Sequence, residues 1–270
     1  MAKFKPTMIE GKPLKPNIRI EQSYKKKIES LTNAMTKEVE RELKKLFKKE
    51  SPAFFAEDAS ITSQSRILLS KLFKKYSRIF DIEGKKITNK MVSQANRHSK
   101  ASVKASLESM KQGLTINVKD LSAETKEMIK ASANQSASYI KSIQSQYLDK
   151  VEGYVYRSIT DGNGLQDLVP NLQKLSGQTL RRSRMIAQDQ YRKTSASLDK
   201  ARMKQNGISK AVWRHASGGM LDPRKSHQQM DGKVFNLDEG LYDPEVGRKI
   251  QPSELVNCKC YYYPILEFDE

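Results

Sequence analysis

Apolar residues recur every three or four positions along most of the chain before residue 207, which is the spacing of one face of an α-helix. The first such stretch covers residues 20–50 and ends where Ser51-Pro52 breaks the pattern. A second covers residues 63–82 and has a broad apolar face, so it is the best candidate for the core of the helical part. Gly84 interrupts the pattern, and a further helix is predicted over residues 87–112.

The middle of the chain predicts a short extended segment and then one long helix. Residues 113–118 alternate between polar and apolar side chains, which is typical of extended backbone. Residues 122–160 then keep helical spacing for nearly forty positions, with Ser122 as the expected N-cap. Asp-Gly-Asn-Gly at residues 161–164 is expected to end this helix, because these residues tolerate a positive φ.

Two more helices are predicted over residues 165–175 and 178–205, separated by Gly177 and closed by Gly207. After residue 207 the period changes from helical to alternating at Ile-Ser-Lys-Ala-Val-Trp. The expected fold is therefore mainly α, with a small C-terminal α+β module. Apolar residues make up 37% of the chain and charged residues 30%, a balance that favours an elongated helical body over a thick globule.

The same features divide the chain into three expected parts. Residues 1–18 contain three prolines and a glycine among four lysines, which predicts an extended basic arm that orders only against a partner. Residues 19–207 form the basic helical body, and residues 208–270 form the α+β module.

Charge separates the body from the module. The chain has a net charge of +18, and residues 1–210 hold 42 basic and 21 acidic side chains, whereas residues 211–270 hold 7 and 10. A basic helical body is expected to bind a polyanion, here double-stranded DNA without sequence preference. A solvated helix face, with Glu38, Glu40 and Glu42 among the lysines, explains the same pattern without DNA. The candidate DNA contacts are Lys25, Lys26, Lys27, Lys44, Lys45, Lys48, Lys49, Lys74, Lys75, Arg181 and Arg182.

The sequence gives no sign of membrane association. It contains no run of eighteen apolar residues, and its first residues lack the apolar stretch of a signal peptide. We therefore expect a soluble protein made in a reducing cytoplasm, with no membrane partner.

Most of the residues able to do chemistry lie in the last sixty positions. Cys258 and Cys260 stand two apart in a β-branched and aromatic context, so on a strand both sulfurs would project from one face. Zinc binding would need two more ligands, and His215 and His227 would complete a Cys2His2 set. Two free cysteines packed as small buried apolar residues are the alternative. A disulfide fits less well, because a C-x-C ring is strained.

A catalytic reading of this cluster has a specific form. Cys258 or Cys260 as nucleophile would need His227 as base and Asp231 as the acid that orients it. Asp231-Gly232 before an apolar strand is more simply a turn, and His227 beside Arg224 is more simply a loop-fixing side chain. We therefore expect no enzyme, with a metal-dependent nuclease or another DNA-processing enzyme as the alternative.

The order of these residues resembles the phage Mu protein F-like family of minor head proteins. The resemblance rests on Trp213, on the run from Arg224 through His227, Asp231 and Gly232 to Phe235, and on Asn-Cys-x-Cys at residues 257–260. It implies that Trp213, Arg224, Asp231, Gly232 and Phe235 form the structural motif of the module. Relatives often have His-Pro before Asn-Cys where this chain has Leu-Val, which removes one possible metal ligand, and an upstream carboxylate role falls to Asp189.

The resemblance also implies a role. It is that of a phage head morphogenesis protein in the capsid interior of the virion, present in the host cytoplasm during assembly. Its partners would be the portal protein and other head proteins, and it would act in head assembly and in packaging or ejection of DNA.

Overall fold

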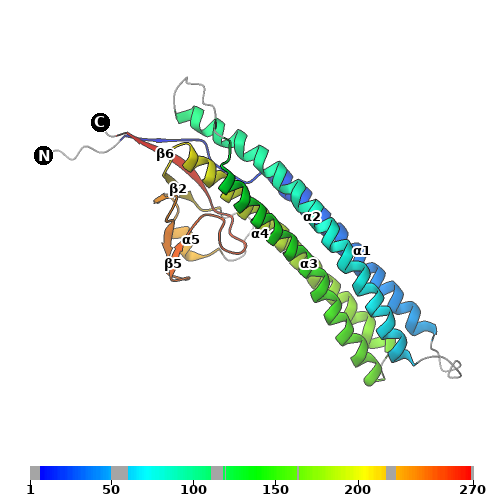
Figure 1. Ribbon diagram of the computed structural model, residues 1–270. Helices are drawn as coiled ribbons and strands as arrows, with labels where there is room; N and C mark the ends of the chain where they lie inside the picture. The colour runs from blue at the N-terminus through cyan, green and yellow to red at the C-terminus, as the bar shows by residue number, and fades with distance from the viewer. Residues whose placement is uncertain are drawn as a thin grey trace. The chain divides into compact units, whose positions relative to one another are not determined.

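The structure is a computed structural model that describes residues 7–49, 60–110, 118, 120–162, 164–216 and 223–268. Long helices dominate these residues, and a small antiparallel sheet is built from three strands of the carboxy-terminal part of the chain and one strand of the amino-terminal segment (Figure 1). The predicted fold class, mainly α with a small C-terminal α+β module, is confirmed. Among the residues described, no helix combines the length and the apolar character that crossing a bilayer requires.

Contacts divide the chain into two compact units, and the four long helices contribute to both. Unit 1 contains residues 1–22, 90–133 and 188–270, and unit 2 contains residues 23–89 and 134–187. The long helices are α1 (Ile18–Lys49), α2 (Ile61–Met110), α3 (Ala123–Thr160) and α4 (Gly164–Gln205).

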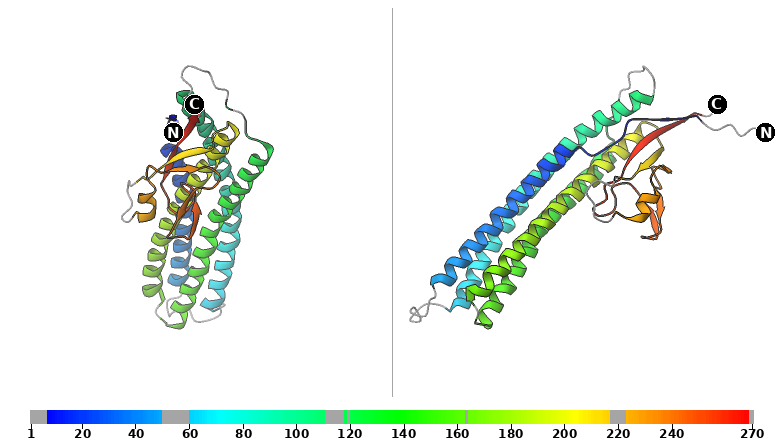
Figure 2. Two further views of the ribbon diagram at one scale, coloured as in Figure 1. Left: turned by 90° about the vertical axis from the view of Figure 1, so that its left-hand side faces the viewer. Right: turned by 180° about the vertical axis from the view of Figure 1, so that it is seen from behind.

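Unit 2 is a four-helix bundle in which consecutive helices run antiparallel, and both views of Figure 2 show these segments side by side. In α1 and α2, Tyr24 meets Thr88 at 3.4 Å while Lys75 binds Glu38 at 2.5 Å, so the two helices run in opposite directions. An ion pair from Lys141 to Asp81 at 3.6 Å joins α3 to α2. Arg182 donates to Ser142 at 2.9 Å, and Arg184 pairs with Glu29, so α4 contacts both α3 and α1.

The predicted apolar spacing accounts for the buried face of α1. Its buried apolar positions are separated by three or four residues or by whole turns, which places them on one side of the helix. They are Tyr24, Ile28, Met35, Val39 and Leu43. Asn17 caps the helix, because its Oδ1 accepts the backbone N–H of Arg19 at 2.9 Å.

The expected interruption at Gly84 is wrong, because α2 continues through it. A Cβ at this position would lie 3.3 Å from Cγ2 of Ile140 on α3. The missing side chain therefore allows α2 and α3 to approach closely, and this packing offsets the low helix propensity of glycine.

The separation at Gly177 is also wrong, because α4 is one helix that contains both Pro170 and Gly177. A Cβ added at Gly177 would meet nothing within 4 Å, so this glycine does not serve close packing. Buried Leu168, Leu172 and Leu175 before it and Thr179 and Ser183 after it continue one buried face. Tertiary packing of this face has overridden the local helix breakers.

The expected start and end of α3 and the expected end of α4 are confirmed. Ser122 Oγ accepts the backbone N–H of Thr125 at 3.1 Å at the start of α3. Gly162 has a φ of 69° directly after α3, and Gly207 has a φ of 81° after α4. The backbone N–H of Ile208 reaches the carbonyl of Met203 at 3.0 Å, which completes a glycine-terminated C-cap.

Unit 1 contains the sheet, whose strands follow the order β1-β6-β2-β3 and are all antiparallel. These are β1 (Thr7–Glu10), β6 (Tyr261–Phe268), β2 (Lys210–Arg214) and β3 (Val234–Asn236). A separate hairpin pairs β4 (Leu241–Asp243) with β5 (Arg248–Ile250), and the short helix α5 (Lys225–Gln229) precedes β3.

The amino-terminal segment belongs to this unit. Strand β1 pairs with β6, and Leu14, which is 2% exposed, enters a core with Val103, Met203 and Trp213. The partner against which the expected arm orders is therefore the chain's own β6. Residues from α2 and α4 share this core, so the compact unit is not bounded at residue 207.

Some expectations fall outside the described residues. They are residues 1–6 of the arm, the break at Ser51-Pro52 and residues 113–117 of the short extended segment. Val118, which closes that segment, is buried in the core of unit 1.

Candidate functional site

Three chain segments of unit 1 bring two histidines and both cysteines together. His215 directly follows β2, His227 lies on α5, and Cys258 and Cys260 stand just before β6. Strands β2 and β6 are paired so that Arg214 faces Tyr261, which places His215 next to Cys260. The cysteines lie before the strand, not on it as the sequence predicted, since β6 begins at Tyr261.

The donor atoms of this cluster converge. Nδ1 of His227 lies 3.5 Å from Sγ of Cys258 and 3.5 Å from Sγ of Cys260. These three atoms all lie within 4.8 Å of one another. Nδ1 of His215 lies 3.7 Å from Sγ of Cys260, and its Nε2 is buried without a hydrogen-bond partner among the described residues. All four residues of the predicted set therefore meet, with His215 at the edge.

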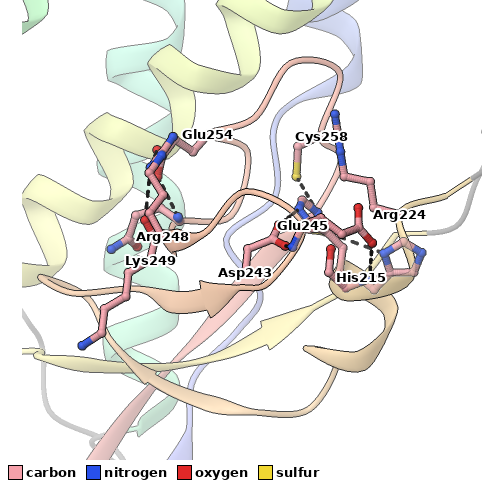
Figure 3. A network of polar contacts seen from close by, with 12 residues as sticks. His215, Arg224, Asp243, Glu245, Arg248, Lys249, Glu254 and Cys258 are labelled. Atoms are coloured by element: carbon pink, nitrogen blue, oxygen red, sulfur yellow. Dashed lines mark hydrogen bonds and ion pairs between the residues drawn. The ribbon is translucent and has the colours of Figure 1, made fainter.

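Asp243, at the end of β4, is the acid that faces His227. Its Oδ2 lies 3.4 Å from Nε2 of His227, and the side chains are 0% and 3% exposed. The predicted orienting acid, Asp231, lies elsewhere, because its Oδ1 accepts the backbone N–H of His215 at 2.8 Å. In Figure 3 the Cys258 sulfur points toward the part of the network where Asp243 and Glu245 lie.

The two thiols affect each other's ionisation. The hydrogen bond from the Cys260 thiol and, to a smaller extent, the contact with His227 together lower the pKa of Cys258 to about 4, although burial opposes this. The same hydrogen bond, together with burial, raises the pKa of Cys260. Two charges so close in a buried site repel each other, so the pair readily holds one thiolate and resists a second.

Buried aromatic side chains enclose the cluster. Trp213, which is 0% exposed, packs edge-on against His227 with ring centroids 5.6 Å apart. Phe235 packs edge-on against Trp213 and against Tyr262, with centroids 5.9 Å and 6.1 Å apart. These side chains hold α5, β3 and β6 against β2.

The remaining residues of the expected motif fix the loops around the cluster. Arg224 donates to the carbonyl of Val256 at 3.1 Å, which ties the start of α5 to the cysteine segment. Gly232 has a φ of 77° and donates its N–H to the carbonyl of Trp213 at 2.9 Å, so Asp231-Gly232 is a turn, as predicted.

Asp189, the carboxylate upstream of the module, holds the turn that precedes Cys258. Oδ1 of Asp189 on α4 accepts the backbone N–H of Asn257 at 3.2 Å. Asn257 has a φ of 62°, a conformation that non-glycine residues seldom adopt. Asp189 therefore helps to hold the strained turn that presents Cys258.

The cluster has little room for a substrate. Cys258 and Cys260 are buried, and the cavity that borders Cys260 has a volume of about 10 Å³, enough for one water at most. This arrangement suits a group of side chains that holds a structure together better than it suits a nucleophile that must meet a substrate.

Some of the predicted DNA contacts bind neighbouring side chains of the bundle, and others are exposed. Lys44 and Lys75 pair with Glu40 and Glu38 at 2.7 Å and 2.5 Å, and Arg182 is half-buried and bound to Ser142. Lys45 lies 3.5 Å from Glu42. Lys26, Lys48, Lys74 and Arg181 are exposed, Lys25 and Lys27 are half-buried, and the side chain of Lys49 lies outside the described residues.

Sequence reasoning named only Lys74 of four exposed basic residues that form a row on α2. Arg66, Lys71, Lys74 and Arg78 are all exposed, and none of them forms an ion pair within the described ranges. Their spacing of five, three and four residues places them on one side of the helix, over about 18 Å at 1.5 Å per residue. The spacing was visible in the sequence, but only the paired helices show which side stays in solvent. We call these four residues the α2 basic row.

Comparison with known proteins identifies the region that holds the cluster. Residues 149–263 match the model of the family described as Phage Mu protein F like protein. Over these residues the chain is similar to the phage Mu protein F-like family. The match includes His215, His227, Asp243 and both cysteines, together with α4, β2, β3 and the start of β6.

Two curated proteins resemble this Mu F-like chain. An uncharacterized protein of Haemophilus influenzae (strain Rd) is 30% identical over 269 residues, which is 96% of the chain and 56% of that protein. The uncharacterized protein YqbB of Bacillus subtilis (strain 168) is 26% identical over 126 residues, 43% of the chain and 41% of that protein. The chain thus spans about half the length of these relatives. No solved structure matches it.

The signal for Asp243 was present in the sequence but could not be interpreted. It stands sixteen residues after His227 in a Tyr-Asp-Pro segment that reads as an ordinary turn. Its pairing with His227 follows from the position of the β4–β5 hairpin, which local sequence pattern does not specify.

Proposed function

We propose that this Mu F-like protein is a minor head protein of a bacteriophage that acts in head assembly and in packaging or delivery of DNA. The family match supports the general role in head morphogenesis. Under this proposal the protein works without catalysis, in the capsid interior of the virion, and is present in the host cytoplasm during assembly. Its partners are the portal protein, other head proteins and the phage genome.

The α2 basic row carries the DNA part of the proposal. Four exposed cationic side chains without acidic partners in the described residues can each approach a phosphate. Neutralising phosphates releases counterions, and this favours binding to any DNA sequence. Ile67 and Phe73, two exposed apolar side chains of α2, lie beside the row.

Salt-dependent binding of the full chain to a mixed-sequence duplex tests this. We expect affinity to fall steeply with salt, and the double variant Lys71→Gln/Lys74→Gln to lower the log–log slope by about 1.8, at about 0.9 per phosphate contact. The matched control is Lys225→Gln/Lys233→Gln, which removes the same charge from exposed positions near the sheet. Equal losses in both variants would show that net charge, and not the α2 basic row, governs binding.

Association with head proteins is tested separately. The full chain should co-sediment with assembled portal protein, and the Lys71→Gln/Lys74→Gln variant should do so equally well if DNA and protein contacts use different surfaces. Failure of the unmodified chain to associate with portal or with heads would contradict the assembly role and leave the DNA result unaffected.

A further inference from the structure

We propose that His227, Cys258, Cys260 and His215 bind one Zn²⁺ ion as a structural site. The site ties the cysteine segment before β6 to α5 and to the end of β2. The inference rests on the cluster geometry and does not depend on the proposed role in phage heads.

The distances between donor atoms fit tetrahedral zinc. Zn–S bonds of about 2.3 Å and Zn–N bonds of about 2.0–2.1 Å give a sulfur-to-nitrogen separation of about 3.6 Å. The three observed S···N distances are 3.5, 3.5 and 3.7 Å. Two thiolates with two imidazoles also form a ligand set that zinc prefers over magnesium or calcium.

The surroundings supply the second shell that such sites use. His227 points Nδ1 at both sulfurs and Nε2 at the buried carboxylate of Asp243, 3.4 Å away. A carboxylate on the far nitrogen of a metal-bound histidine fixes its ring and tautomer. Asp243 is itself held, because its Oδ1 accepts the backbone N–H of Glu245 at 2.9 Å.

The fourth ligand needs only a local adjustment. His215 already approaches Cys260, and its backbone N–H is fixed by Asp231 at 2.8 Å. Its ring is partly buried, and zinc binding would require a side-chain rotation that moves Nδ1 closer to the other donors. In this reading Asp231 is a positioning residue for His215.

Buried polar atoms behind the proposed ligands also lack good partners in the described part of the chain. Nε2 of His227, Oδ2 of Asp243 and Nε2 of His215 are all buried without a well-formed hydrogen bond among the described residues. Buried polar atoms without partners are costly. A cation between the sulfurs and Nδ1 of His227 would strengthen the His227–Asp243 contact, because the metal-bound imidazole becomes a better donor at Nε2.

Metal content of the full chain is the first measurement. Protein made with added zinc and purified without chelator should contain about one zinc per chain. Cys258→Ser, Cys260→Ser and His227→Gln should lose it. The control His98→Gln changes the one histidine outside the cluster, a half-buried residue on α2 near Ser102, and should keep the metal. A zinc content below about a tenth of an equivalent per unmodified chain would overturn the proposal.

Two further readouts keep the test informative if a cysteine variant fails to fold. Asp243→Asn keeps an oxygen for the Glu245 N–H and should weaken zinc binding about 10- to 100-fold in competition with a chromogenic chelator. Cobalt in place of zinc should give the visible absorption of a tetrahedral thiolate site. Unchanged affinity in Asp243→Asn, or no cobalt absorption in the unmodified chain, would each contradict the assignment.

Discussion

Asp199 is a carboxyl group enclosed in unit 1 and only 2% exposed. Burial raises its pKa to about 7, although Ser99 and the nearby Arg202 guanidinium oppose the shift. The folded protein therefore holds a proton on Asp199 in a pH range where the unfolded chain, with a carboxyl pKa of 3.8, has released it.

This proton makes stability depend on pH. Because the folded pKa is raised, the contribution of Asp199 is fully present below about pH 4 and is lost as pH rises through about 7. At about 1.4 kcal/mol per pKa unit, the upper bound of the change is about 4 kcal/mol. We expect Asp199→Asn to remove this decline, so the difference in free energy of unfolding between the unmodified chain and the variant should fall from pH 4 to pH 7.

Urea unfolding at several pH values measures the difference, and Asp161→Asn, at an exposed residue after α3, is the control that should keep the original profile. Parallel pH profiles for the unmodified chain and Asp199→Asn would show that the buried carboxyl does not titrate in this range.

At the scale of elements, two glycines inside long helices have opposite environments. Gly84 in α2 faces Ile140, whereas Gly177 in α4 has open space where its Cβ would be. Sequence alone gave both the same interpretation, as helix breaks. The difference between them is set by which helix lies alongside.

Substitution by alanine should separate the two environments. Gly177→Ala gains helix propensity without a clash and should stabilise the protein by about 0.5–1 kcal/mol. Gly84→Ala places its Cβ 3.3 Å from Ile140, so the gain should be reduced or reversed, and Gly84→Leu should cost about 1–3 kcal/mol through overpacking. Thermal unfolding of the three variants provides the comparison. Equal stabilisation by both alanines would show that α2 and α3 do not pack closely at Gly84.

At the scale of the whole molecule, charge and packing divide the chain differently. Charge changes sign near residue 210, yet the compact units carry 26 basic and 18 acidic side chains in unit 1, and 23 and 13 in unit 2. The acidic module is thus joined to basic segments of α2 and α4 in one unit. A truncation after Gly207 would remove strands and core residues from that unit, so we expect it to disturb the folding of unit 1 as well as to remove the module.

Substitution of Leu14 tests whether the amino-terminal segment stabilises the core of unit 1. Leu14→Ala should lower the free energy of unfolding by about 2–5 kcal/mol, because a buried leucine leaves a cavity. Ile18→Ala changes a residue that is 65% exposed and should stay within about 0.5 kcal/mol. Chemical denaturation of both variants compares them. A small effect at Leu14, similar to that at Ile18, would show that the amino-terminal segment is a dispensable arm.

Local pattern in the sequence determined the helical positions, most helix ends and the change to strands after Gly207. Helical spacing, N-caps and positive-φ glycines act over a few residues, so they can be read without a fold. The same is true of the ligand types at the cluster, since His215, His227, Cys258 and Cys260 are chemically distinctive in any context. The resemblance carried by Trp213, by residues 224–235 and by residues 257–260 pointed to the family whose model residues 149–263 match.

Only the tertiary structure decided what depends on residues far apart in the chain. It paired Asp243 instead of Asp231 with His227, joined β1 to β6, carried α2 through Gly84 and left the α2 basic row in solvent. Each of these outcomes is set by contacts between separate elements, whose energies exceed the local preferences of one glycine or one turn. The sequence determines those contacts, but no local hydrophobic period or motif indicates which elements will pack together.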